Sequence, residues 1–273
     1  MRSWLRALNH RRKQARISRR APVKTRWGFQ FVGPATMQSG SFEQASVDLT
    51  AHLIWRSDRF VNVGANAGYY CAIAQTRDIP TVAIEPNPTT VALLQRNMQL
   101  NGWDQNISVL PVATGDRSGF IEIFGEGTGA SVVPGWAGNP TVAGKTVPVV
   151  RLETVVPAPA IGEKVFVLMD VEGFELAALK GARTLVEATS KPVWMVEISR
   201  TVHQPDGVGT NPNFAETMML FRDAGYSALA TERGAQDVTW DALISGEHAS
   251  AGDNFVFCDQ VLKQDLLEKF SQG

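Results

Sequence analysis

The amino-acid sequence predicts an α/β fold in which helices cover both faces of a mainly parallel sheet. Short apolar runs alternate with helix-like segments along most of the 273 residues, and this alternation is typical of parallel strands joined by crossover helices. Three of the apolar runs end at or beside an acid, namely Glu85, Asp170 and Glu197. Ligands bind beyond the carboxyl ends of the strands in such sheets, so we expect these acids to meet in one crevice.

In the first half of the chain, hydrophobic spacing and capping residues define the elements. A helix over 41–54 is predicted from one apolar stripe, which consists of Phe42, Ala45, Leu49 and Leu53. Asn87 caps a further helix, Pro88 takes its first position and Asn101-Gly102 ends it. The other predicted elements here are strands at 27–32, 59–63, 81–84, 107–111 and 120–124, and a helix over 68–75.

The second half continues the same alternation. Residues 165–170 form its most hydrophobic strand, and 213–224 is predicted as a helix because Phe214, Met218 and Phe221 fall on one face. Further strands are predicted at 147–150, 193–198, 226–231 and 254–258, with a helix over 174–187 and a polar helix at the C-terminal end. Residues 125–145, rich in Gly, Ala, Pro and Thr, are interpreted as a mobile loop or insertion over the site.

The charge distribution divides the chain into a basic arm, residues 1–26, and a single domain, residues 27–273. The arm holds ten Lys and Arg and no acid, which leaves 16 of the 26 cations against all 27 acids in the remainder. The domain is long enough for one large core. The arm is interpreted as a solvated tail, a contact to an anionic membrane through Trp4, Leu5 and Leu8, a contact to nucleic acid, or an organelle transit peptide.

The location is predicted as cytoplasmic, with a membrane-peripheral placement as the alternative. No run approaches the roughly 18 apolar residues that a membrane span needs, and Arg11 to Arg20 interrupts any secretory signal. The two cysteines, Cys71 and Cys258, lie in apolar surroundings. We therefore expect both to be buried, reduced thiols.

A glycine-containing turn follows the strand at 59–63 and predicts a nucleoside site. The turn has Gly64, Asn66 and Gly68, whereas a dinucleotide site needs glycines at positions i, i+2 and i+5. The third of those positions is Tyr69, and no P-loop Lys-Ser or Lys-Thr follows. A cofactor with a ribose and no pyrophosphate fits best, which favours S-adenosylmethionine with Glu85 on the ribose hydroxyls. The alternative is a turn that only joins a strand to a helix.

Six segments in this order resemble the FkbM family of S-adenosylmethionine-dependent methyltransferases. They are Val61-Asn-Val-Gly-Ala-Asn-Ala-Gly68, Ile84-Glu-Pro-Asn-Pro88 with Asn97 and Asn101, Ala113-Thr-Gly-Asp116, Val147-Pro-Val-Val-Arg-Leu-Glu153, Met169-Asp-Val-Glu-Gly-Phe-Glu-Leu176 with Leu179-Lys-Gly-Ala182, and Pro192-Val-Trp-Met-Val-Glu197. The resemblance covers roughly residues 40–200. The Glu-Pro-Asn-Pro and Asp-Val-Glu-Gly-x-Glu segments are its most specific parts.

The resemblance implies the class I methyltransferase fold, a Rossmann-like sheet of seven strands with the last one antiparallel. It also implies a cofactor site, and it places Asp170 at the reaction centre. Asn62 stands where the family usually has Asp, so cofactor binding is expected to weaken modestly. Glu153, also in place of Asp, is interpreted as structural. The expected cofactor-binding residues are Glu43, Asn62, Gly64, Ala65, Asn66, Gly68, Tyr69, Glu85, Pro86, Asn87, Ala113, Thr114 and Asp170. Glu43 is included because it lies near the start of the helix at 41–54, at a position that could reach the methionine end of the cofactor. The alternative is an acid that only favours the helix N-terminus.

The candidate catalytic residues are Asp170, Glu172 and His203. Methyl transfer to a hydroxyl needs an oriented acceptor and a group that removes its proton, and carboxylates and histidine can do this. Asp170, Glu172 and Glu175 fall within six residues. They supply oxygen ligands that a divalent cation would accept, although no metal ligand is assigned. Glu175 is also interpreted as an acid that favours the dipole of the following helix.

The sequence therefore predicts an S-adenosylmethionine-dependent methyltransferase, with O-methylation of a hydroxyl on a small molecule or a glycan as the leading hypothesis. One alternative is a methyltransferase that acts on RNA or protein and uses the basic arm. Another is a non-catalytic module that binds the cofactor or docks to a membrane. The oligomeric state is not predicted.

Overall fold

The structure is a computed structural model that describes residues 12, 16–42, 44–103, 105–231, 234–246 and 252–271. Most of the basic arm and Glu43 lie outside these residues, so the predictions made for them concern parts of the chain that are not described. Within the described ranges, no helix is both long enough and apolar enough to cross a bilayer.

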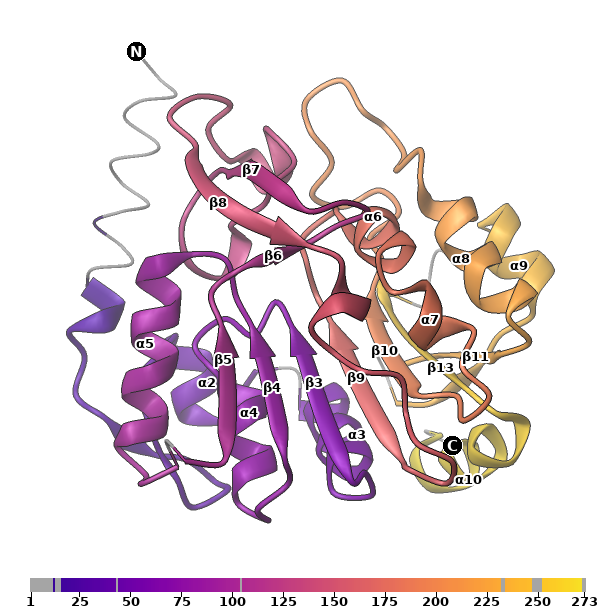
Figure 1. Ribbon diagram of the computed structural model, residues 1–273, viewed down its shortest axis with the longest axis horizontal. Coiled ribbons are helices and arrows are strands. Elements are labelled where there is room, and N and C mark those ends of the chain that lie inside the picture. Colours follow the sequence, from indigo (N-terminus) through magenta and orange to yellow (C-terminus); the bar gives the residue numbers. More distant parts are fainter. Residues whose placement is uncertain are drawn as a thin grey trace.

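A twisted central sheet organises the molecule (Figure 1). Its strand order is β12-β11-β13-β10-β9-β3-β4-β5, and the pairs from β10 to β5 are all parallel. β13 runs antiparallel to both of its neighbours. The strands are β3 (Arg59–Val63), β4 (Thr81–Ile84), β5 (Ile107–Leu110), β9 (Val165–Met169), β10 (Val193–Glu197), β11 (Ser227–Ala230), β12 (Gln236–Asp237) and β13 (Asn254–Cys258).

The sheet has the expected antiparallel last strand, and it has one strand more than the expected seven. The addition is β12, two residues that pair with the outer edge of β11. The predicted bounds of the strands at 59–63, 81–84 and 254–258 are confirmed.

The strand register determines the position of the site. Val63, the last residue of β3, pairs with Ile84 of β4 and with Met169 of β9, each also the last residue of its strand. Gly64, Glu85 and Asp170 follow directly, so the three chain segments leave the sheet side by side.

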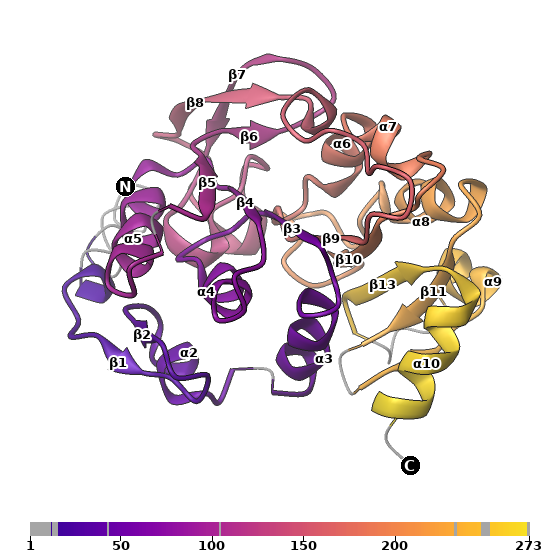
Figure 2. The same ribbon diagram turned by 60° about the horizontal axis from the view of Figure 1, so that its bottom comes forward.

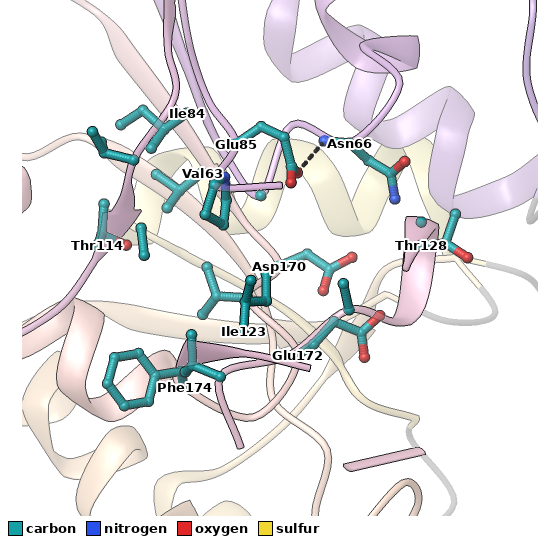
Figure 3. Close-up of a pocket in the computed structure, with 18 residues that line it drawn as sticks. Val63, Asn66, Ile84, Glu85, Thr114, Ile123, Thr128, Asp170, Glu172 and Phe174 are labelled. Carbon is teal, nitrogen blue, oxygen red and sulfur yellow. Dashed lines mark hydrogen bonds between the residues drawn. The ribbon is translucent and has the colours of Figure 1, made fainter. Parts of the chain in front are cut away.

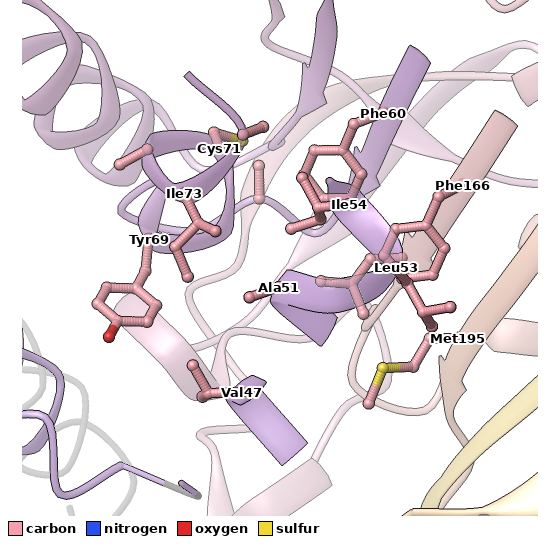
Figure 4. Close-up of a cluster of buried hydrophobic side chains, with 14 of the residues drawn as sticks. Val47, Ala51, Leu53, Ile54, Phe60, Tyr69, Cys71, Ile73, Phe166 and Met195 are labelled. Atoms are coloured by element: carbon pink, nitrogen blue, oxygen red, sulfur yellow. The ribbon is translucent and has the colours of Figure 1, made fainter. Parts of the chain in front are cut away.

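Helices cover both faces of the sheet, as the alternation predicted (Figure 2). One face carries α3 (Gln44–Ile54), α4 (Tyr69–Gln75), α5 (Pro88–Gln99) and α10 (Gln260–Phe270), and the other carries α6 (Glu175–Lys180), α7 (Arg183–Val186), α8 (Phe214–Asp223) and α9 (Trp240–Ser245). Successive residues of a strand point to opposite faces of the sheet, so they pack into two separate cores. Phe60, Phe166 and Met195 pack with α3 and α4 (Figure 4), and Val61, Val167 and Trp194 belong to the opposite core.

The predicted helix over 174–187 is wrong as a single element. The chain forms α6 and α7 with a break at Gly181 and Ala182. A Cβ on Gly181 would lie 1.9 Å from the carbonyl oxygen of Gly115, so a neighbouring loop packs against the backbone at the break. In α7, the Thr184 N–H donates to Glu153 at 3.0 Å, in agreement with a structural role for Glu153.

A separate three-stranded sheet lies over the carboxyl edge of the central sheet (Figure 1). It has the order β6-β8-β7 and consists of β6 (Ala113–Thr114), β7 (Gly119–Ile123) and β8 (Lys145–Val150). The segment between β7 and β8 contains two short 3₁₀ helices, η1 (Gly127–Gly129) and η2 (Trp136–Gly138). The two longer strands were predicted, but their separation from the main sheet was not.

An N-terminal hairpin completes one side of the molecule. β1 (Val23–Lys24) pairs with β2 (Gln30–Phe31), and α2 (Ala35–Ser39) follows. The strand predicted at 27–32 is therefore shorter than expected. Asn97 on α5 holds this segment, because its side chain accepts from the Val32 N–H at 2.8 Å and donates to the Val32 carbonyl at 2.9 Å.

Candidate functional site

The turn after β3 brings the backbone against the neighbouring strand ends. The N–H groups of Gly64 and Ala65 both donate to the Ile84 carbonyl at 2.9 Å. Gly64 has φ +85°, and a Cβ there would lie 1.7 Å from the Asp170 carbonyl oxygen. Asn66 has φ 48°, the left-handed conformation that asparagine tolerates. Only glycine fits position 64, and the close approach of β3 and β9 depends on it.

Glu85 is held at the centre of the site by two backbone donors. Its Oε2 accepts from the Asn66 N–H at 3.0 Å (Figure 3), and its Oε1 accepts from the Asn87 N–H at 2.8 Å. The side chain is 7% exposed. Burial raises the pKa of Glu85 to about 7 despite these two hydrogen bonds, and the nearby Asp170 charge adds to the rise. The two hydrogen bonds hold the carboxylate in a fixed orientation at the wall of the cavity.

A first cavity lies between Glu85 and the three-stranded sheet. Gly64, Glu85, Pro86, Ala113 and Thr114 line it, as the predicted cofactor site requires. The Thr114 hydroxyl is buried and has no hydrogen-bond partner among the described residues. An unsatisfied buried hydroxyl costs free energy. A ligand that hydrogen-bonds to it would remove that cost, and the polar edge of a nucleoside could do so. The first cavity has a volume of about 50 Å³, so a bound nucleoside would also occupy space beyond it.

A second, larger cavity continues from the first at the same sheet edge, with a volume of about 370 Å³. Gly64, Asn66, Thr128, Asp170 and Glu172 line both cavities. Its other walls include Asn62, Ala65, Tyr69 and His203 from the predicted site, and Met37, Phe42, Tyr70, Met195 and Glu197. A volume of this size is within the ordinary range of small-molecule sites.

The carboxylates of Asp170 and Glu172 point to the same side, toward Thr128 (Figure 3). Glu172 has φ 54°. Burial first, and then the Asp170 charge, raise the pKa of Glu172 to about 8, and the indole N–H of Trp136 opposes this rise. Both acids thus line the junction of the two cavities, and their charges interact there.

Glu175 does not line either cavity. It is the first residue of α6, 3% exposed, and its Oε1 accepts the Gly173 N–H at 2.9 Å. This is the helix-terminal role that the sequence suggested. Burial raises the pKa of Glu175 to about 7.

The free energy of unfolding of Glu175→Gln, compared with that of wild type at the same pH, is expected to increase between pH 5 and pH 8. The raised pKa means that the unfolded chain ionises first, from about pH 4.5, so the free energy of unfolding falls until the folded-state pKa near 7 is passed. Glutamine does not ionise, so the variant should avoid up to about 3 kcal/mol of that fall. Urea denaturation of both proteins at pH 5 and pH 8 measures the difference in their free energies of unfolding. Glu268→Gln, at an exposed position, is the control, and an equal difference for Glu175→Gln at both pH values would contradict the expectation.

The structure does not bring every predicted residue to a cavity wall. Gly68 lies at the start of α4 with φ +82°, and the Asn87 side chain caps α5 by accepting from the Thr89 N–H at 3.2 Å. Glu43 lies outside the described residues. His203 is exposed and lines the second cavity. Among the described side chains, no group of three or more His, Cys, Asp and Glu is placed to hold a metal ion.

Sequence reasoning missed the wall formed by Met37, Phe42 and Met195, and it missed Trp136. The first three come from separate segments, and each has the hydrophobic character of an ordinary core residue. Trp136 stands in a segment rich in small residues, and this contrast is the one local signal that it has a tertiary contact.

Comparison with known proteins supports the predicted family. The family model described as "Methyltransferase FkbM domain" matches residues 62–228, more than half of the chain. No curated protein matches the chain.

Among solved structures, the FkbM methyltransferase from Methylobacillus flagellatus KT is 21% identical, with 74% of this chain and 43% of that chain covered and a TM-score of 0.43. The chain thus spans less than half of that protein. A putative O-methyltransferase from Klebsiella pneumoniae is 13% identical over 83% of each chain, with a TM-score of 0.41. A SAM dependent methyltransferase from Aquifex aeolicus is 12% identical over 78% of this chain and 87% of its own, with a TM-score of 0.37.

The mainly parallel sheet with an antiparallel last strand has the class I methyltransferase architecture that the resemblance implied. With the match over residues 62–228, it shows that the chain belongs to the FkbM methyltransferase family.

Proposed function

We propose that this protein transfers a methyl group from S-adenosylmethionine to a hydroxyl group of a small molecule or a glycan. The observation that carries the proposal is the meeting of Gly64, Glu85 and Asp170 at three adjacent strand ends, where two cavities join. One cavity has polar groups suited to the nucleoside part of the cofactor. The other is lined by further expected cofactor-binding residues, Asn62, Ala65 and Tyr69, and its volume of about 370 Å³ leaves room for an acceptor beside them.

The residues of the first cavity, together with Asn62 and Ala65 of the second, would hold the cofactor. The turn at Gly64 would allow close approach of its methionine and ribose parts, Glu85 would accept hydrogen bonds from the ribose hydroxyls, and Thr114 would lie near the adenine. When bound, the cofactor supplies a methyl group already activated on a sulfonium.

The acids at the junction would act on the acceptor. A hydroxyl held in the second cavity would give its proton to a carboxylate as it accepts the methyl group that the cofactor supplies, and the thioether would be the leaving group. Asp170 and Glu172 are the candidates for this group, with His203 as a third. The raised pKa of Glu172, about 8, suits a base that works near neutral pH.

Asp170→Asn is expected to lower methyl transfer by at least about 100-fold, the usual contribution of a general base, and to weaken S-adenosylhomocysteine binding by much less. The amide keeps the shape of the side chain but cannot accept the proton. The test is transfer of radiolabelled methyl groups to a panel of free sugars and glycans, beside calorimetry with S-adenosylhomocysteine. Asp223→Asn, at an exposed position on α8, is the matched control.

Wild-type protein that fails to bind S-adenosylhomocysteine would contradict the proposal. So would Asp170→Asn protein that retains full transfer, which would favour the non-catalytic alternative. Contact of residues 1–26 with an anionic membrane or nucleic acid, and a cytoplasmic location, stay predictions. Activity of a chain that lacks residues 1–26 on a glycan would exclude the alternative in which the arm recruits RNA or protein.

A further inference from the structure

Trp136 attaches the segment between β7 and β8 to the acidic junction. The residue is 3% exposed, and its indole N–H donates to Glu172 Oε2 at 2.7 Å. Its ring lies against Gly173, where a Cβ would approach the ring atom Cε3 to 2.5 Å. The indole therefore reaches the carboxylate because residue 173 has no side chain.

Further hydrogen bonds hold the same segment and the same acid. The Ser131 hydroxyl donates to the Glu172 carbonyl at 2.6 Å, and the Ala137 N–H donates to the His203 carbonyl at 2.8 Å. Glu172 is thus fixed by its side chain and by its backbone. These contacts support its φ of 54°, a conformation that costs free energy in a residue with a long side chain.

The anchored segment also forms walls of the site. Thr128 lines both cavities, Ala130 and Val132 line the first, and Gly129 and Ala137 line the second. The contacts of Trp136 therefore hold both the Glu172 side chain and the segment that forms part of the wall of each cavity.

We propose that Trp136 is a positioning residue, which holds the Glu172 carboxylate toward the place where the sulfonium of the cofactor meets the acceptor. This inference rests on the proposed function. It goes further because it states what orients Glu172. One hydrogen bond from Trp136 holds the carboxylate in place, and this carboxylate supplies negative charge beside the sulfonium.

The charge of Glu172 depends on the groups around it. Asp170 precedes it on the same segment and Glu175 on α6 lies near, and both raise the pKa of Glu172. His203 and Glu197 line the same cavity. The side-chain hydrogen bond from the Trp136 N–H favours the ionised form, so removing this donor should raise the pKa of Glu172 further.

Two ligands that differ in charge at one atom test the inference. S-adenosylmethionine carries the sulfonium and S-adenosylhomocysteine a neutral thioether, so the ratio of their Kd values reports negative charge beside the sulfur. Titrations that affect both ligands equally, such as that of Glu85 under the ribose, cancel in this ratio. Calorimetry from pH 6.5 to 9 with the full chain measures it.

In wild type, the preference for S-adenosylmethionine is expected to increase through about pH 8 as Glu172 ionises. Trp136→Phe keeps a ring against Gly173 and deletes the donor, and should move the midpoint up by about one pH unit, the worth of a charge-assisted hydrogen bond. Gly173→Ala, which displaces the indole, should act in the same direction. Trp55→Phe is the matched control, because Trp55 donates its indole N–H to the Ile73 carbonyl at 3.3 Å, outside both cavities.

Glu172→Gln should remove the pH dependence of the ratio. A midpoint that moves no further in Trp136→Phe than in Trp55→Phe overturns the positioning role, and so does an unchanged pH dependence in Glu172→Gln. In both cases the two ligands still bind, so the proposed function stands. Wild-type protein that binds neither ligand overturns the inference and the proposed function together.

Discussion

Gly64→Ala is expected to lower the free energy of unfolding by about 4 kcal/mol, which combines left-handed backbone strain with overpacking. The new Cβ would lie 1.7 Å from the Asp170 carbonyl oxygen, with φ at +85°. The backbone of Asp170 is held in place, because its N–H donates to the Val63 carbonyl at 2.9 Å and so continues the pairing of β3 with β9. Its carbonyl therefore cannot move away freely. Thermal unfolding should show a decrease in Tm of roughly 10 °C for a chain of this size.

Gly162→Ala separates the two causes. Gly162 has φ +82°, nearly that of Gly64, but nothing lies within 4 Å of a Cβ built there. Its substitution should cost only the backbone strain, about 1–2 kcal/mol. Equal losses for Gly64→Ala and Gly162→Ala would show that the approach of the two strand ends does not limit residue 64. S-adenosylhomocysteine binding should be lost in the first variant and retained in the second.

The central sheet was predictable because local chemistry defines its strands. The strands at 59–63 and 81–84 are buried runs that stop at a glycine turn or an acid, and their observed bounds match. The parallel register then brings Gly64, Glu85 and Asp170 together. Residues that end parallel strands share one sheet edge whatever their distance in sequence.

Features that depend on contacts between distant segments were not predictable. The break at Gly181 depends on the Gly115 carbonyl, 66 positions earlier in the sequence. The separate sheet depends on the choice of partner for β8, which alternation alone does not specify. Trp136 has its role because Gly173 leaves room for its ring and Glu172 accepts its N–H, and neither contact has a periodic signal.

Glu85→Gln is expected to weaken S-adenosylhomocysteine binding by roughly 100-fold, the effect of about 2.7 kcal/mol. Both carboxylate oxygens accept backbone N–H groups, from Asn66 and from Asn87. An amide in either orientation turns its NH₂ group toward one of these donors and leaves that buried N–H without an acceptor. The variant also loses the negative charge that would strengthen hydrogen bonds from the ribose hydroxyls. Calorimetry at pH 8 measures the change.

Glu175→Gln is the matched control, since Glu175 is also buried, also accepts a backbone N–H, and also has a pKa raised to about 7. It does not line the first cavity, so its loss should change the affinity by less than about 3-fold. If the two variants weaken binding equally, the effect of Glu85→Gln comes from general destabilisation of the sheet edge and not from contact with the ribose.

The pH dependence of binding gives a second, independent test of Glu85. Its pKa of about 7 means that the side chain is partly protonated at pH 6.5 and ionised at pH 8. Because the ionised form accepts hydrogen bonds from both the backbone and the ribose, S-adenosylhomocysteine should bind more tightly as the pH rises through 7. In Glu85→Gln this part of the rise should disappear. Binding by wild type that weakens over the same interval would mean that the neutral carboxyl is the binding form, and the assignment of Glu85 to the ribose hydroxyls would then fail.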